Sequence, residues 1–132
     1  MAALTEFKRL SGKLFMDGAL RASSATTMFD IIEPATEDVI GQIADATDAE
    51  VDEAIGIAGR ARRTWNAIDA RSRAVTLHDI AAVIRRDKAL YAEYLTREEG
   101  KPFKESVDEV SWCATAIDYY AELARHEQGR IA

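Results

Sequence analysis

Few side chains in this sequence could do covalent or acid–base chemistry. Cys113 is the only thiol, and a nucleophilic cysteine needs a neighbouring base that keeps it as the thiolate. It lies three residues after Val110 in an alanine-rich stretch of helical spacing, which favours a small packed side chain over a nucleophile. We therefore expect Cys113 to be buried and unreactive.

The two histidines and one conspicuous lysine are better explained by structural roles. His78 adjoins the apolar stripe of a predicted helix, and His126 falls in a last helical turn, where the helix dipole favours a cation. Neither histidine has a sequence neighbour that indicates acid–base catalysis. Lys101, between Gly100 and Pro102, is interpreted as a cation near a helix end rather than as a Schiff-base lysine.

Acidic side chains gather between positions 98 and 109, where they are typical of a solvated face. Spacing alone does not distinguish such a face from paired catalytic carboxylates. The seven glycines form no G-x-G-x-x-G and no P-loop, so no phosphate-binding loop is predicted. One cysteine and two histidines cannot complete a four-ligand zinc site. We therefore assign no catalytic and no cofactor-binding residue. The acidic residues are Glu98, Glu99, Glu105, Asp108 and Glu109.

The composition limits the class of protein. A chain of 132 residues has the length of one ordinary domain. Lys and Arg number 17 against 23 Asp and Glu, a net charge of −6, which disfavours nucleic acid and anionic membranes as partners. The apolar residues include 24 alanines but only 29 Leu, Ile, Val and Phe. Large side chains for a core are therefore scarce, which raises the question of whether the chain is complete.

The sequence shows no disulfide pair, secretory signal or membrane span, and these absences indicate the cellular compartment. A single cysteine forms no internal disulfide, which is typical of a reducing compartment. The first ten residues contain Glu6, Lys8 and Arg9 and no uninterrupted apolar run, so they do not form a secretory signal. No segment approaches the roughly 20 apolar residues of a membrane span. We expect a cytoplasmic protein without membrane contact.

Strands and turns are predicted over residues 13–44. Asp17-Gly18 separates two short apolar stretches and can take the positive φ angles of a hairpin turn. Two further strands, at 28–32 and 39–43, flank Pro34, which lacks the N–H that a sheet ladder needs and so favours a turn between them.

A helical array is predicted over residues 47–128. Thr47 and Glu50 form a capping box at the start of the first helix, and Asp69 and Asp87 are expected to cap the second and third. The first helix carries an apolar stripe at Val51, Ala54, Ile55, Ala58, Arg62 and Trp65, and the second at Ala74, Leu77, Ile80, Ala81 and Ile84.

The third helix is expected to end at Gly100, which suits a left-handed C-terminal position, with Pro102 just beyond it. A fourth helix follows Pro102 and is predicted to fray near Gly129. Its apolar stripe comprises Val107, Val110, Ala114, Ile117 and Ala121, and the third helix carries Leu90, Tyr94 and Leu95.

The order of these elements and of several short motifs resembles the N-terminal segment of the NAD(P)-dependent aldehyde dehydrogenase superfamily. Each motif is weak alone, but together they follow the family's order over about residues 14–125. The motifs are Phe15-Met16-Asp17-Gly18, Ile32-Glu33-Pro34-Ala35-Thr36, Asp52-Glu53-Ala54, Trp65, Ser72-Arg73-Ala74 before Ile80-Ala81, Glu99-Gly100-Lys101-Pro102 and Tyr119-Tyr120-Ala121.

One of these motifs departs from the family's pattern. Glu33 stands where the family has Asn, and Glu37-Asp38 stand where it has Gly-Glu. Because turn chemistry depends on such residues, we expect a less stable turn before the strand that begins at Val39.

The resemblance implies an α/β fold in which residues 1–132 form a single partial domain, the first part of a cofactor-binding domain. The family oxidises aldehydes to carboxylic acids with NAD or NADP, through a catalytic cysteine, a glutamate and an asparagine that lie after the position of Ala132. Cys113 does not match that nucleophile. Some members hold a monovalent cation with an acidic side chain to which Glu109 corresponds, and oxygen ligands suit such a cation; a plain surface role for Glu109 is equally compatible.

Two hypotheses about function remain. In the first, the chain is the N-terminal part of an oligomeric aldehyde dehydrogenase, inactive alone, whose partner is the rest of that enzyme or a homologous subunit. In the second, it is a non-catalytic helical interaction module that binds a partner or a full-length homologue. Four amphipathic helices without a sheet to cover are the reason for the second.

Overall fold

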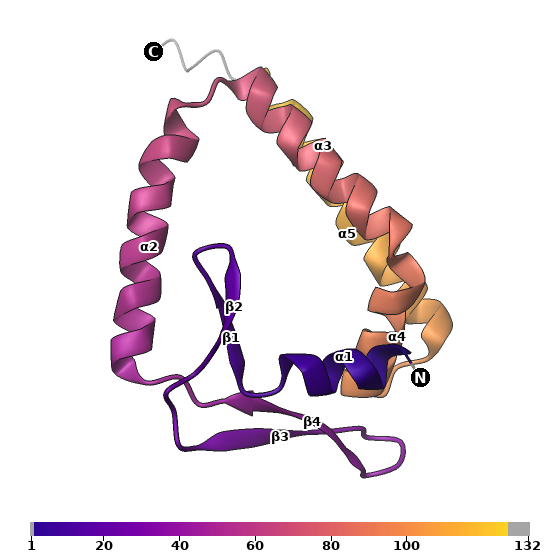
Figure 1. Cartoon of the computed structure of the whole chain (residues 1–132). Coiled ribbons are helices and arrows are strands. Elements are labelled where there is room, and N and C mark those ends of the chain that lie inside the picture. The colour runs from indigo at the N-terminus through magenta and orange to yellow at the C-terminus, as the bar shows by residue number, and fades with distance from the viewer. Residues whose placement is uncertain (1, 127–132) are drawn as a thin grey trace, which may run out of the picture.

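The computed structural model describes residues 2–126, with side chains from Thr5 onward. Its elements form the three sides of an open triangle (Figure 1). The strands and a first helix, α1 (Ala2–Leu10), form one side, a single helix, α2 (Asp48–Ala67), forms the second, and three helices form the third. Short strands followed by helices agree with the α/β class and the mostly helical composition that the sequence predicts.

The first hairpin forms where the sequence predicts it. Strands β1 (Lys13–Met16) and β2 (Ala19–Ala22) pair antiparallel. Asp17 and Gly18 both have positive φ, 52° and 77°, which is the geometry of a two-residue turn that matches the twist of the strands.

The second hairpin pairs β3 (Met28–Ile32) with β4 (Val39–Ala44), with an irregularity in register between Ile31 and Ile32. Its connecting turn is closed by hydrogen bonds from the Glu33 N–H to the Asp38 carbonyl, at 2.9 Å, and from the Glu37 N–H to the Glu33 carbonyl, at 2.8 Å. Glu37 has a φ of 63°, a left-handed conformation that suits glycine. The turn therefore forms with a strained residue where the related family has glycine.

Helix α1 lies outside the elements that the sequence predicts, which begin at residue 13. Its Phe7 packs with Ile40 of β4 in a small buried cluster that Ile31 and Tyr94 partly cover. The rings of Phe7 and Tyr94 lie 5.3 Å apart between centroids in a tilted arrangement. This aromatic contact joins the strand side of the triangle to the helical side.

The Glu50 carboxylate fixes the start of α2, and Glu53, three residues further on, pairs with Arg21 of β2 at 2.7 Å. Thr47 and Glu50 form the predicted capping box. Glu50 also accepts hydrogen bonds from the Ser24 N–H, at 2.7 Å, and the Ser23 hydroxyl, at 2.9 Å. The Ser24 and Thr47 amides lower the pKa of Glu50 to about 2. One ionised side chain therefore ties the loop after β2 to the helix N-terminus.

Beyond its first turn, helix α2 is open to solvent along its length. None of its residues is buried, and the predicted stripe is exposed at Val51, Ile55 and Trp65. The periodicity predicts this helix correctly, but within the described residues no other element buries its apolar face.

The third side of the triangle consists of α3 (Ala70–Arg86), α4 (Lys88–Glu99) and α5 (Phe103–Leu123). Asp69 caps α3 as predicted, accepting from the Ser72 N–H at 3.0 Å. The predicted cap at Asp87 is wrong, because its carboxylate bonds the adjacent Arg86 instead of the backbone of α4. Gly100 ends α4 in the left-handed conformation, as predicted. The predicted fraying near Gly129 lies outside the described residues.

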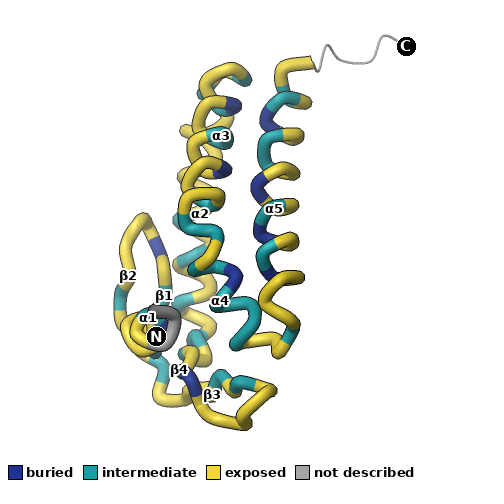
Figure 2. The backbone as a smooth tube through the Cα atoms, turned by 90° about the vertical axis from the view of Figure 1, so that its right-hand side faces the viewer, coloured by how far each residue is buried: buried dark blue, intermediate teal, exposed yellow. Residues whose placement is uncertain are grey.

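Helices α3 and α5 lie side by side, with α5 running back along α3 (Figures 1 and 2). The buried residues on their facing stripes are mostly alanines. In each helix these alanines are seven positions apart and so lie on one face, and their small side chains let the two backbones approach closely. Leu77, Ile84, Val107 and Ile117 are half-buried as part of these stripes, whereas Ile80 is 45% exposed, contrary to prediction. The buried residues are Ala74 and Ala81 on α3 and Val110, Ala114 and Ala121 on α5.

The chain exposes far more surface than a compact monomer of its mass. Its accessible area is 9650 Å², against roughly 6,900 Å² for a folded protein of this size. Large apolar side chains contribute to the excess, including Phe15, Phe29, Trp112 and Tyr120. The scarcity of core residues in the sequence therefore corresponds to a structure whose apolar faces are open.

Replacing the strained residue of the second turn is expected to stabilise the chain. The left-handed conformation costs a residue with a Cβ roughly 1–2 kcal/mol, part of which glycine returns as backbone entropy. We expect Glu37→Gly to raise the free energy of unfolding in urea by about 1 kcal/mol. Glu37→Ala, which removes the charge but keeps the Cβ, is the matched control and brings no such gain. Equal stability of the two variants would contradict this account.

Candidate functional site

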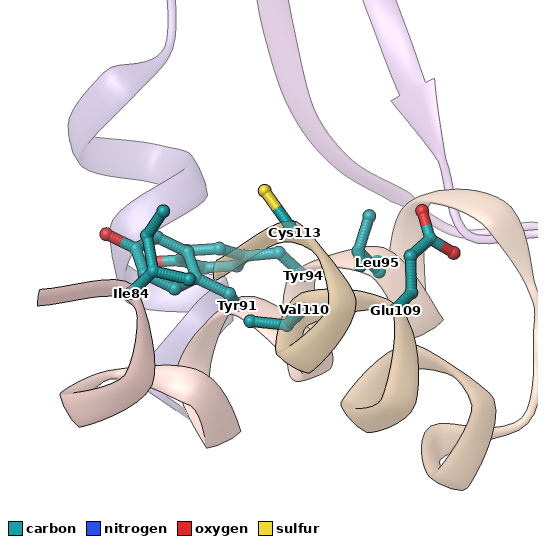
Figure 3. A pocket seen from close by; sticks show the side chains of 7 residues that line it. All are labelled: Ile84, Tyr91, Tyr94, Leu95, Glu109, Val110 and Cys113. Atoms are coloured by element: carbon teal, nitrogen blue, oxygen red, sulfur yellow. The ribbon is translucent and has the colours of Figure 1, made fainter. Parts of the chain in front are cut away.

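An apolar groove lies where α4 meets α5 (Figure 3). It has a volume of about 510 Å³, and Tyr91 and Tyr94 lie edge to face along it with ring centroids 6.3 Å apart. Only one lining residue, Glu109, is charged. Such a lining suits an apolar segment of a protein better than a polar substrate. The lining residues are Ile84, Tyr91, Tyr94, Leu95, Glu109, Val110 and Cys113.

Cys113 is exposed, contrary to the prediction that it is buried. It follows Trp112, which is 76% exposed, so this part of α5 points away from the contact with α3. The buried residue of the alanine-rich stripe at this point is Ala114, the residue after Cys113. Within the described residues no base hydrogen-bonds the thiol, so the geometry does not make Cys113 a nucleophile.

Glu109 lies at the edge of the groove with its carboxylate against the ammonium of Lys101. Lys101 also pairs with Glu99 at 2.7 Å, and the bonds to Glu109 and Glu99 raise the pKa of Lys101. Lys101 is therefore a firmly protonated cation at the end of α4, as the sequence indicates, and not an amine ready for Schiff-base chemistry.

The acidic residues between positions 98 and 109 have exposed positions, as the sequence predicts. All five lie on the exposed surface of α4 and α5. Within residues 2–126 no group of three or more His, Cys, Asp or Glu side chains is placed to hold a metal ion. The assignment of Glu109 to a monovalent cation stays a prediction. The five are Glu98, Glu99, Glu105, Asp108 and Glu109.

The two histidines have different surroundings. His126 lies in the turn after α5, where its backbone N–H donates to the Leu123 carbonyl at 3.0 Å. His78 contacts two carboxylates of α5, Asp118 and Glu122, which lie 40 and 44 residues away in sequence. Sequence reasoning missed this cluster, although an acidic pair four residues apart on one predicted helix is a signal that could have been matched to a histidine on another.

The described helix starts do not offer a site for a dinucleotide. A pyrophosphate binds well at a helix N-terminus whose amides are free and whose surroundings are not negative. Here α2 begins with Asp48 and Glu50, α3 is preceded by Asp69, α4 by Asp87, and the first turn of α5 holds Glu105. All strands of the described chain pair as antiparallel hairpins. The starts of α2 to α5 therefore do not fit the pyrophosphate of NAD or NADP.

Comparison with known proteins identifies the source of this architecture. A family model described as "Aldehyde dehydrogenase family" matches residues 20–132. The chain belongs to the aldehyde dehydrogenase family. The chain is 35% identical over 118 residues to the lactaldehyde dehydrogenase of Escherichia coli, and 34% identical over 119 residues to the D-glyceraldehyde dehydrogenase (NADP(+)) of Thermoplasma acidophilum. The resemblance inferred from the short motifs is thereby confirmed.

The match covers most of this chain but only part of its relatives. It extends over 89% and 90% of this chain and over 25% and 24% of those two aldehyde dehydrogenases. This chain therefore spans about a quarter of the length of the curated relatives it matches, and it corresponds to their N-terminal segment.

Solved aldehyde dehydrogenase structures contain the same arrangement of elements. The structure of Escherichia coli lactaldehyde dehydrogenase superposes with a TM-score of 0.86 at 34% identity, over 92% of this chain and 25% of that one. A betaine aldehyde dehydrogenase of Staphylococcus aureus, solved in complex with NAD+, gives a TM-score of 0.89 at 27% identity, over 99% of this chain and 26% of its own. The open triangle is therefore a shape that exists inside complete enzymes of the family.

If Glu109 binds a monovalent cation, sodium or potassium must displace Lys101 from its carboxylate. We expect titration with either salt to raise the thermal midpoint of the wild-type chain and to leave that of Glu109→Ala unchanged. Glu105→Ala, an exposed residue one turn earlier on α5, is the control and should respond like the wild type. If the added salt leaves the midpoints of the wild type and of Glu109→Ala unchanged, the prediction is wrong.

Proposed function

We propose that this chain is the N-terminal part of an NAD(P)-dependent aldehyde dehydrogenase, in which residues 1–132 contribute part of the cofactor-binding domain. The reaction of the complete enzyme is oxidation of an aldehyde to a carboxylic acid. The observation that carries the proposal is the match in sequence and in shape to a quarter of complete enzymes. The chain's own role is to supply the outer strands and helices against which the remainder of the enzyme packs.

The uncovered faces support this role. Val51, Ile55 and Trp65 form an apolar row along α2, and the helices of the opposite side leave Val75 and Val83 exposed. Exposed apolar residues on this scale mark a surface meant for contact with protein. Residues that would close these faces are expected in the three quarters of the enzyme that this chain does not match.

Alone, the chain is proposed to be inactive and to bind neither NAD nor NADP. The described residues bring together no nucleophile and base, and their helix starts carry carboxylates where a pyrophosphate needs free amides. Among the helices that the structure describes, none is long and apolar enough to cross a membrane. We further propose a cytoplasmic, oligomeric parent enzyme whose partner for this chain is its own remainder or a homologous subunit.

A chimera tests the proposal directly. The matched N-terminal quarter of Escherichia coli lactaldehyde dehydrogenase is replaced by this chain, and NAD(P)H formation from lactaldehyde is followed. We expect the chimera to be active, because the chain supplies a fold of the same shape. Ile55→Asp in the chimera should abolish activity by placing a charge in the buried contact, whereas Glu37→Asp, on an exposed turn, should not.

The 132-residue chain alone is the companion sample, tested with a panel of aldehydes and both cofactors. We expect no NAD(P)H from it. Activity of the isolated chain would overturn the proposed inactivity. A folded but inactive chimera, together with tight binding of the isolated chain to a full-length homologue, would favour the alternative function as a helical interaction module.

A further inference from the structure

A polar cluster crosses the contact between α3 and α5 and plays no part in the proposed function. His78 of α3 lies between two carboxylates of α5. Its Nδ1 is 2.6 Å from Oδ1 of Asp118, and its Nε2 is 2.8 Å from Oε1 of Glu122. Asp118 and Glu122 are four residues apart and thus on one face of α5. Each ring nitrogen therefore has a carboxylate of its own.

This arrangement requires a particular protonation state. A neutral imidazole has one N–H and one nitrogen lone pair, whereas the imidazolium has two N–H donors. A lone pair facing a carboxylate at hydrogen-bond distance is repelled, so only the imidazolium satisfies both Asp118 and Glu122. The geometry alone thus points to a doubly protonated His78.

The other charged groups around the cluster are guanidinium groups. Arg85, two turns further along α3, contacts the second oxygen of Asp118. Arg125, just after α5, contacts Glu122 at 3.1 Å. With Asp118 and Glu122, these are the charged side chains that join the cluster within the described chain. Loss of the His78 proton leaves one ring N–H, which can donate to only one of the two carboxylates, while Arg85 of α3 still contacts Asp118 and Arg125 still contacts Glu122. Deprotonation therefore removes one of the two histidine contacts between α3 and α5.

The place of the cluster in the fold gives this change a mechanical consequence. Helix α4 connects α3 to α5 at one end of the pair, so the two helices are covalently held together there (Figure 1). Asp118 and Glu122 lie in the last two turns of α5, away from the end that α4 joins, and His78 contacts them from the middle of α3. Ala121, three residues after Asp118 on α5, is buried but small, so it contributes little apolar area.

We propose that His78 is a proton-dependent clip that holds the C-terminal half of α5 against α3, and that its deprotonation loosens this end of the helix pair. Glu122 and then Asp118 raise the pKa of His78 by hydrogen bonding, and the histidine lowers the pKa of both carboxyls. A raised pKa in the folded state means that the stabilisation is complete below the ordinary imidazole value and is lost as the pH rises through the raised value. The clip is therefore closed below the ordinary imidazole pKa while both carboxyls are ionised, and it opens as the pH rises through the raised pKa of His78.

The test is a titration of the full 132-residue chain labelled with 15N in its histidine rings. His126→Gln leaves His78 as the single histidine and is the control for assignment. We expect both ring nitrogens of His78 to remain protonated at pH values above the ordinary imidazole pKa of about 6.5. Asp118→Asn and Glu122→Gln, which preserve side-chain shape, should each lower the measured pKa of His78.

A thermal melt supplies the structural readout. As the pH rises through the measured pKa of His78, the melting midpoint of the wild type and of His126→Gln should fall. The fall should be smaller in His78→Gln, which carries no titrating group at this position. The proposal is overturned if His78 titrates at its ordinary value, or if neither carboxyl variant shifts that value. It stands independently of the proposed function, because neither a chimera nor an aldehyde substrate enters the measurement.

Discussion

The close approach of α3 and α5 through alanines is the contact on which the helical side of this molecule depends. Ala74, Ala81, Ala114 and Ala121 are almost fully buried where the two helices meet. Alanine permits close packing, but it removes little apolar area from water. The contact therefore fixes the direction of two long helices without supplying the large core that a domain of this length normally has.

The rest of the architecture follows from this limitation. Bulky side chains such as Trp112 and Tyr120 are excluded from the alanine contact and point away from it. Helix α2 buries no residue, and it is held at its start by the Glu50 carboxylate. The strand side is joined to α4 by the aromatic contact between Phe7 and Tyr94 and by the ion pair between Glu33 and Arg97, at 2.8 Å. Such an open frame is readily explained if its faces are completed by the remainder of an aldehyde dehydrogenase.

Features that depend on local chemistry could be predicted from the sequence. The Asp17-Gly18 turn, the Thr47–Glu50 capping box and the left-handed Gly100 each depend on residues a few positions apart, and the structure contains all three. Features that depend on distant partners could not. The cover over Phe7, the exposure of Cys113 and the pairing of His78 with Asp118 are decided by which faces meet in space, and periodicity does not specify this. The failed cap at Asp87 is an exception among the local features, because the adjacent Arg86 binds its carboxylate.

The central claim is that the apolar faces of this chain are contact surfaces for the remainder of an enzyme. The binding of an apolar fluorescent dye to the isolated chain, under conditions where its helices are intact, measures those faces most directly. The account predicts strong dye fluorescence from a helical chain, because α2 and the outer sides of α3 and α5 are open to solvent. Dye fluorescence as weak as that of an ordinary folded monomer would contradict it, since the faces would then be closed within the chain itself.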